Sequence, residues 1–281
     1  MRSRPAMPRL GLGVSGALGW TYITNRRDAL RLILEAHEQG IRHFDTGHSY
    51  CAGEAEVTLG MAVAEIGRGN VFLSTKLGTK AVGRLGRVVQ SFSHRDLEES
   101  LTTSLRRLRC ETIDLLMLHS PPSGEVKRGL DFLCDARERG LTSLIGASIA
   151  PEQLQLPDVA RCDVVMVKHC LSNPLAPSAI ERTRAMGVWI IAKRALAVDN
   201  GGSRALLPRG LRRADLWYSL RMLKNRVRRP VSAAAPLSSI ADRLQFVLAT
   251  VDGAVFGSTR AEHVRANAII ARDMGLLDSG Q

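Results

Sequence analysis

Short apolar runs recur along the chain and are separated by longer stretches in which apolar and polar residues alternate with a different period. The short runs are rich in β-branched and other apolar side chains, which is typical of strands buried on both faces of a parallel sheet. Eight of them lie at residues 10–14, 41–45, 71–76, 113–119, 143–147, 163–168, 188–193 and 253–257.

The longer stretches have helical period. In 94–108, leucines recur at spacings of three and four, which places them on one face of an amphipathic helix. Ser93 or His94 is expected to begin this helix, because acidic residues fill its first turn and favour a helix N-terminus. Equivalent patterns predict helices over residues 27–39, 54–66, 125–139, 151–160, 176–186, 236–250 and 261–274. Glycines suited to a left-handed C-cap follow three of these helices, at Gly40, Gly140 and Gly187.

Eight strands alternating with eight helices predict an α/β fold, the (β/α)8 TIM barrel, as a single domain over residues 1–281. A doubly wound open sheet is the alternative, with a glycine-rich phosphate loop after its first strand. Gly11, Gly13 and Gly16 match G-x-G-x-x-G. This pattern begins inside the first strand and no helix follows directly, so we do not interpret it as a dinucleotide-binding fingerprint.

One segment interrupts the alternation. Residues 196–235, after the seventh strand, are much longer than a usual connection. Within this insertion, 211–226 has a helical pattern, and its place after a strand predicts that it lies over the barrel mouth. The part 204–229 contains nine arginine and lysine residues against one acid, Asp215. It therefore carries most of the formal net charge of +12.

Composition narrows the possible partners and locations. A net charge of +12 suggests nucleic-acid binding, but outside 204–229 no interleaved aromatic and basic residues suggest a single-strand binder. We therefore rank nucleic acid as an improbable partner. No run approaches the ~18 apolar residues of a membrane helix, and no apolar signal segment is visible. The five cysteines are scattered without C-x-x-C, which predicts reduced thiols, no metal site and a cytoplasmic location. The sequence gives no prediction of oligomeric state.

Polar residues that could carry chemistry follow three neighbouring strands. Asp45 ends the second predicted strand, Tyr50 lies just beyond it, Lys76 ends the third and His119 ends the fourth. The C-terminal ends of barrel strands meet at one mouth, where barrel enzymes place their catalytic residues. Each residue alone has an ordinary structural explanation. Four at the same end predict an active site.

These residues lie in motifs of a known family. FDTGHSY, GEAEVTLG, STK, IDLLMLHS and GSTRAEHVRAN occur in the order and spacing of the aldo-keto reductase superfamily, which the chain resembles from about residue 9 to 272. The resemblance implies a barrel that binds a nicotinamide cofactor, usually NADPH, and reduces a carbonyl. It implies the catalytic tetrad Asp45, Tyr50, Lys76 and His119. Tyr50 would donate the proton, and the Lys76 ammonium would lower the pKa of that phenol. Asp45 would hold Lys76, and His119 would orient the carbonyl.

The resemblance also implies cofactor-binding residues. Backbone N–H groups at the start of the last helix suit a phosphate, Arg260 suits the 2′-phosphate of NADPH, and two further side chains lie one turn apart and could flank the adenine. The expected set is Gly257, Ser258, Thr259, Arg260, His263 and Asn267, together with Ser148 after the fifth strand and Lys193 and Arg194 at the end of the seventh.

Three positions depart from the pattern that the family commonly shows around the nicotinamide. Ile149 replaces an asparagine, Met166 replaces a glutamine and Lys193 replaces a stacking aromatic residue. The departures leave open whether other groups, such as His169, hold the nicotinamide, and whether Lys193 and Arg194 bind the pyrophosphate instead.

Substrate contacts and alternative activities complete the expectations. Trp20 and Tyr22 follow the first strand and His48 precedes the tyrosine, so we expect these three to contact substrate. The basic insertion favours an anionic or carrier-bound carbonyl compound. Two alternatives to a reductase remain open on the same barrel. One is a redox-neutral lyase, dehydratase or epimerase, and the other is a non-catalytic accessory protein that binds NADPH.

Overall fold

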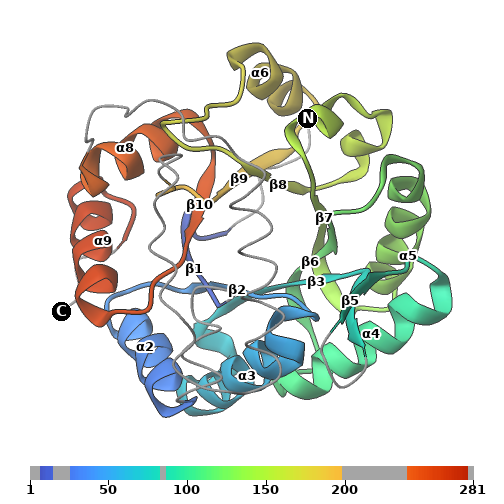
Figure 1. Ribbon diagram of the computed structural model, residues 1–281, viewed down its shortest axis with the longest axis horizontal. Helices are drawn as coiled ribbons and strands as arrows, with labels where there is room; N and C mark the ends of the chain where they lie inside the picture. Colours follow the sequence, from blue (N-terminus) through green and yellow to red (C-terminus); the bar gives the residue numbers. More distant parts are fainter. Residues whose placement is uncertain (1–6, 15–25, 83–86, 198–238, 278–281) are drawn as a thin grey trace.

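A computed structural model describes residues 7–14, 26–82, 87–197 and 239–277 of the chain. Eight parallel strands close into a barrel in the order β1-β10-β9-β8-β7-β6-β3-β2 (Figure 1). All eight predicted strands are confirmed. Their bounds are β1 Leu10–Gly13, β2 His43–Asp45, β3 Phe72–Leu77, β6 Ile113–His119, β7 Thr142–Ser148, β8 Val164–Lys168, β9 Trp189–Lys193 and β10 Gly253–Phe256.

Helices surround the barrel and cover the outer faces of its strands (Figure 1). They are α2 Arg26–Glu38, α3 Glu54–Ile66, α4 His94–Leu108, α5 Val126–Glu138, α6 Pro177–Ala185, α8 Ile240–Thr250 and α9 Ala261–Asp273. Ser93 is the N-cap of α4, since its Oγ accepts a hydrogen bond from the Asp96 amide. Gly40, Gly140 and Gly187 have φ of 88°, 75° and 77°, as the expected C-caps require.

The prediction of one helix over 151–160 is wrong. The chain forms two short 3₁₀ helices there, η4 Pro151–Gln155 and η5 Pro157–Arg161. Pro157 explains the break, because a proline pushes the preceding residue out of helical conformation, and Leu156 is extended with φ of −65° and ψ of 134°. The predicted helix 211–226 lies outside the described residues.

A two-stranded hairpin was not anticipated. The strands β4 Thr79–Val82 and β5 Arg87–Gln90 pair in antiparallel register beside the barrel. Three further 3₁₀ turns, η1 Tyr50–Gly53, η2 Arg68–Asn70 and η3 Ser123–Glu125, complete the described elements.

Alternation along the strands determines which side chains reach the mouth. Val164 and Met166 of β8 belong to the cluster inside the barrel, whereas Val165 and Val167 pack outward on the helices. The next inward position on β8 is therefore Lys168, because strand side chains alternate with period two. Lys193 is the register partner of Lys168 on β9 and shares its face. Ionisable residues at several strand ends thus face one mouth.

The helices of the described ranges are all too short or too polar to span a lipid bilayer.

Candidate active site

A buried ion pair forms the centre of the site. Lys76 Nζ, on β3, lies 2.7 Å from Asp45 Oδ1 and 2.6 Å from Asp45 Oδ2, on β2. The Lys76 ammonium also donates to the Thr46 carbonyl oxygen at 2.6 Å. Lys76 is 1% exposed and Asp45 is 4% exposed. Burial by itself lowers the pKa of Lys76, but the Asp45 carboxylate and the Tyr50 phenol outweigh it and raise the pKa. Lys76 is therefore a fixed cation at neutral pH.

A chain of hydrogen bonds supports the Asp45 carboxylate from inside the barrel. Ser74 Oγ donates to Asp45 Oδ1 at 2.7 Å, so its oxygen accepts from His43 Nε2 at 2.8 Å. Burial is the main cause that lowers the pKa of His43 to about 4. The imidazole is therefore neutral, with its proton on Nε2. Together these contacts fix the orientation of the carboxylate that holds Lys76.

Tyr50 lies at the start of η1 and faces the pair from the loop after β2. Lys76 Nζ lies 5.4 Å from the centroid of the Tyr50 ring. The Tyr50 and His119 rings meet edge to face, with centroids 5.2 Å apart and an interplanar angle of 88°. The structure thus brings the four predicted catalytic residues together.

The pKa of Tyr50 differs in direction from our expectation. Burial raises this pKa above its usual value, and the opposing effect of the Lys76 ammonium is smaller. The phenol is consequently protonated at neutral pH. Lys76 remains close enough to stabilise a phenolate that forms when the proton leaves.

The loop that carries Tyr50 has an unusual backbone and a dedicated anchor. Cys51, Ala52 and Gly53 have left-handed φ of 52°, 54° and 96°, which is unfavourable for residues with a Cβ. Arg107, on α4, donates to the carbonyl oxygen of His48 at 3.2 Å. Such a contact helps the fold to hold a strained segment in place.

A buried carboxylate fixes Arg107. Arg107 Nη1 lies 3.2 Å from Glu56 Oε2, and Thr75 Oγ1 donates to Glu56 Oε1 at 2.8 Å. Glu56 is fully buried. Burial raises the pKa of Glu56, while its hydrogen bonds and Arg107 partly offset the change. The side chain is thus a structural anchor between α3, α4 and β3.

The structure places His48, one of the expected substrate contacts, within this anchor. Its Nδ1 lies 3.2 Å from Ser104 Oγ of α4 and 3.8 Å from Glu56 Oε2 of α3. His48 is 9% exposed, and burial is the main cause that lowers its pKa to about 4. A neutral His48 therefore packs behind the Tyr50 loop. Trp20 and Tyr22, the other two expected substrate residues, lie outside the described residues.

The opposite wall of the mouth contains few polar groups. Lys193 Nζ, at the end of β9, donates to Ser148 Oγ at the end of β7 over 2.9 Å. Ile149 and Met166, two of the three departures from the family pattern, are 1% and 2% exposed; Met166 packs inside the barrel and Ile149 packs in the outer core. Burial, with help from the Lys76 and Arg194 charges, lowers the pKa of Lys193 to about 8. Ser148 and Lys193 are therefore the described hydrogen-bonding side chains that this wall offers to a ligand.

His169 does not serve the mouth. Its Nε2 lies 2.7 Å from Thr250 Oγ1, its Nδ1 accepts from the Leu175 amide at 3.0 Å, and its ring stacks on Phe246. Both ring nitrogens are thus engaged. The suggestion that His169 holds the nicotinamide is therefore not supported.

The residues after β10 suit the phosphate end of a dinucleotide. Ser258 Oγ accepts from the Arg260 amide at 3.1 Å and orders the turn into α9. Arg260 is the N-cap of α9 and gives no side-chain cap, so the first-turn amides are open to an anion. Gly257, Thr259, Arg260 and His263 are exposed.

One turn further along α9 lies a buried group that a ligand could satisfy. Asn267 is 2% exposed, and its Oδ1 has no hydrogen-bond partner among the described residues. Buried polar atoms are normally satisfied. The orphaned amide oxygen therefore fits the expected contact with an adenine, whose amino group is a donor.

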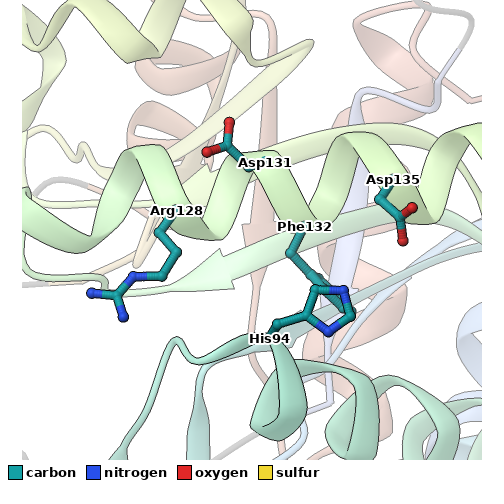
Figure 2. A pocket seen from close by; sticks show the side chains of 5 residues that line it. All are labelled: His94, Arg128, Asp131, Phe132 and Asp135. Atoms are coloured by element: carbon teal, nitrogen blue, oxygen red, sulfur yellow. The ribbon is translucent and has the colours of Figure 1, made fainter.

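A surface cavity of about 330 Å³ lies elsewhere, between α4 and α5. Figure 2 shows the His94 side chain, at the start of α4, against Phe132 of α5, with centroids 5.2 Å apart. Charged residues around the cavity form salt bridges with neighbouring residues: Arg128 pairs with Glu125, and Asp135 pairs with Arg139. This cavity is on the outside of the barrel and contains none of the tetrad. The described residues contain no group of three or more potential metal ligands among His, Cys, Asp and Glu.

Several supporting residues were missed from the sequence. Glu56 shares the buried face of α3 with Leu59 and Val63, at spacings of three and four. An acid on the apolar face of an amphipathic helix signals a buried network, and this signal could have identified Glu56. No comparable signal was available for Ser74 or Arg107, because their partners are distant in sequence.

Comparison with known proteins agrees with the geometry. A model of the Aldo/keto reductase family matches residues 9–272. An NADH-specific methylglyoxal reductase of Escherichia coli (strain K12) is 25% identical over 234 residues, which are 75% of this chain and 72% of that protein. An aldo-keto reductase of Mycobacterium avium (strain 104) is 32% identical over 161 residues, 57% of this chain and 50% of that protein.

Solved structures share the fold. A glycerol dehydrogenase from Gluconobacter oxydans superposes with a TM-score of 0.72 at 23% identity, covering 95% of this chain and 87% of that chain. The holo form of an aldo-keto reductase from Bacillus halodurans gives a TM-score of 0.70 at 22% identity, covering 96% and 92%. With the family match over most of its length, the chain belongs to the aldo/keto reductase family, a family of oxidoreductase enzymes.

Proposed function

We propose that the protein is an NADPH-dependent reductase of a small carbonyl compound, with Tyr50 as the proton donor. The observation that carries this proposal is the cluster that Tyr50 forms with the buried Lys76–Asp45 pair and with His119, whose ring meets the Tyr50 ring edge to face. These residues supply a protonated acid, a fixed cation beside it and an imidazole at the same mouth.

Each residue has a distinct task in carbonyl reduction. Tyr50 donates its proton to the carbonyl oxygen, and Lys76 stabilises the resulting phenolate. Asp45 keeps Lys76 charged and in place, and His119 orients the carbonyl oxygen next to the phenol. When bound, the nicotinamide cofactor supplies the hydride. General acid catalysis of this kind typically accelerates a reaction ~10²–10⁴-fold.

The cofactor preference rests on the entry to α9. The open first-turn amides and the exposed guanidinium of Arg260 suit a 2′-phosphate, and Asn267 Oδ1 suits the adenine. Ser148 and Lys193, which are bonded to each other at the ends of β7 and β9, would face the bound ligand. One relative is named as NADH-specific, so the choice between NADPH and NADH is itself part of the test.

The test is a steady-state assay with methylglyoxal and other small aldehydes and ketones, following oxidation of NADPH or NADH. We expect Tyr50→Phe to lower kcat/KM by at least ~100-fold while cofactor binding, measured by nicotinamide fluorescence, is retained. We expect Arg260→Ala to weaken the binding of NADPH but not that of NADH. Full activity of Tyr50→Phe would disprove the assigned acid, and equal binding of both cofactors by the wild type would disprove the NADPH preference.

A redox-neutral activity is the second candidate, favoured by one observation. Met166 adds an apolar group to the cluster inside the barrel, and Lys193 has a pKa of about 8, suited to acid–base work. Failure to bind either nicotinamide cofactor would make this candidate the leading one. Tight NADPH binding without turnover of any carbonyl would instead favour an accessory protein.

A further inference from the structure

Lys193 is a partly buried cation that pairs with no carboxylate in the part of the chain that the structure describes. Its Nζ donates to Ser148 Oγ at 2.9 Å. Among the described residues, no carboxylate forms a salt bridge with it, and the nearby Asp45 pairs with Lys76. An ammonium has three N–H donors, so two remain for another acceptor. A cation withdrawn from water is costly unless it is paired.

The charged groups that face Lys193 do not neutralise it. Asp45, on β2, lies within electrostatic range, but both of its oxygens bind Lys76. Lys76 on β3 and Arg194 in the next position add positive charge. Lys168 on β8 occupies the paired register position and brings another lysine to the same face. Among the described residues, this wall of the mouth is therefore electropositive, because Lys76 and Arg194 lie near Lys193.

The choice of lysine is itself informative. The chain has 39 basic residues, of which six are lysines, at positions 76, 80, 127, 168, 193 and 224. Three of the six lie at the barrel mouth, in a chain that otherwise uses arginine. Lysine differs from arginine in that burial readily lowers its pKa, as it does at Lys193.

We propose that Lys193 and Ser148 form an oxyanion-binding site at the barrel mouth, which receives a carboxylate or phosphate group of the bound ligand. Lys193 supplies a positive charge and two N–H donors that no described residue engages, and Ser148 holds the ammonium in position. The assignment deepens the proposed function and rests on it only for the source of the oxyanion. That source is either a carboxylate on the carbonyl substrate or the pyrophosphate of the cofactor.

The site can be tested without catalysis. The melting temperature of the wild type, Lys193→Met, Lys193→Arg and Lys127→Met is measured with millimolar sulfate, at constant ionic strength set by chloride. Lys127 is an exposed lysine that pairs with Asp131, so its variant controls for the loss of one charge. We expect the apparent sulfate affinity to fall at least about tenfold in Lys193→Met, and to persist in Lys193→Arg and Lys127→Met. Equal sulfate stabilisation of the wild type and Lys193→Met would overturn the proposal.

Dependence on pH gives a readout that a structural role would not produce. Sulfate keeps its charge between pH 7 and 9.5, whereas an ammonium whose pKa is about 8 loses its proton over this range. We expect sulfate binding by the wild type to weaken across the range and that of Lys193→Arg to be nearly constant. Parallel pH profiles of the two proteins would contradict the assignment.

Two further arms identify the source of the oxyanion. If Lys193→Met raises the dissociation constant for NADPH at least tenfold, the site binds the pyrophosphate of the cofactor. An unchanged dissociation constant for NADPH, with a tenfold higher KM for pyruvate but not for methylglyoxal, would assign it to a substrate carboxylate. No change in either constant would overturn the ligand assignment. Failure of the proposed function has a different signature: full activity of Tyr50→Phe, or no cofactor binding by the wild type. Neither result changes the interpretation of the sulfate measurement.

Discussion

The Lys76–Asp45 pair illustrates how one contact serves both stability and chemistry. Both side chains are nearly inaccessible to water, and both carboxylate oxygens are within 2.7 Å of the ammonium. A buried pair contributes little net stability relative to apolar residues, but removing one partner leaves the other as an uncompensated charge. The pair is therefore best understood as a device that keeps a cation beside Tyr50.

Variants of this pair separate the two roles. We expect Lys76→Met to reduce the free energy of unfolding by ~3–5 kcal/mol, because it strands the Asp45 carboxylate. Adding Asp45→Asn should recover most of that loss, because no buried charge then remains. Urea unfolding measures both values, and neither protein should reduce a carbonyl at the wild-type rate. A Lys76→Met variant as stable as the wild type would show that the carboxylate finds another partner.

Helices α3 and α4 approach unusually closely, and this approach supports the Tyr50 loop. A Cβ added to Gly60 of α3 would lie 2.1 Å from the carbonyl oxygen of Arg107 in α4. The side chain of the same Arg107 reaches His48 and Glu56. The glycine thus sets the distance over which Arg107 can hold the loop.

For this reason, an alanine at position 60 should change the free energy of unfolding in the direction opposite to that predicted by helix propensity. Gly→Ala inside a helix usually stabilises by about 1 kcal/mol. We expect Gly60→Ala to destabilise the protein by about 1–3 kcal/mol instead, because backbone atoms of α4 must move. Gly69→Ala is the control, since nothing lies within 4 Å of its added Cβ. Thermal unfolding of both variants decides the matter, and a higher melting temperature for Gly60→Ala would refute the account.

At the scale of elements, the sequence predicted those helices and strands that have a regular period of apolar residues. The strands and most helices follow from the alternation of apolar and polar residues. The stretch 151–160 has the composition of a helix, but Pro157 divides it into two 3₁₀ turns. The hairpin of β4 and β5 escaped because its strands are only four residues long and partly exposed. Local composition does not reveal such short pairings.

At the scale of the whole molecule, topology explains why the tetrad could be predicted. Parallel strands in a closed barrel bring their C-terminal ends to one mouth, so Asp45, Lys76 and His119 were placed together by strand order alone. The bond from Lys193 to Ser148 joins residues 45 positions apart. The direction of the Tyr50 pKa depends on how burial balances the Lys76 charge. Neither can be read from a pattern along the chain.

Global stability should fall in acid because of two histidines that the fold buries in the neutral form. The pKa of His43 and of His48 is lowered from 6.5 to about 4, mainly by burial. Between these values the unfolded chain binds a proton that the folded protein excludes. The stabilisation is complete above about pH 6.5 and is lost as pH falls toward 4, at about 2 kcal/mol per histidine by pH 5 and about 3 kcal/mol by pH 4.

The measurement is the free energy of unfolding by urea at pH 7.5 and at pH 5. We expect His48→Gln to lose about 2 kcal/mol less than the wild type between these two pH values, because glutamine does not titrate. His263→Gln, which changes an exposed histidine of α9, should follow the wild type. If His48→Gln and the wild type lose the same free energy, His48 is protonated in the folded protein, and the anchor formed by Glu56 and Arg107 must accommodate its charge.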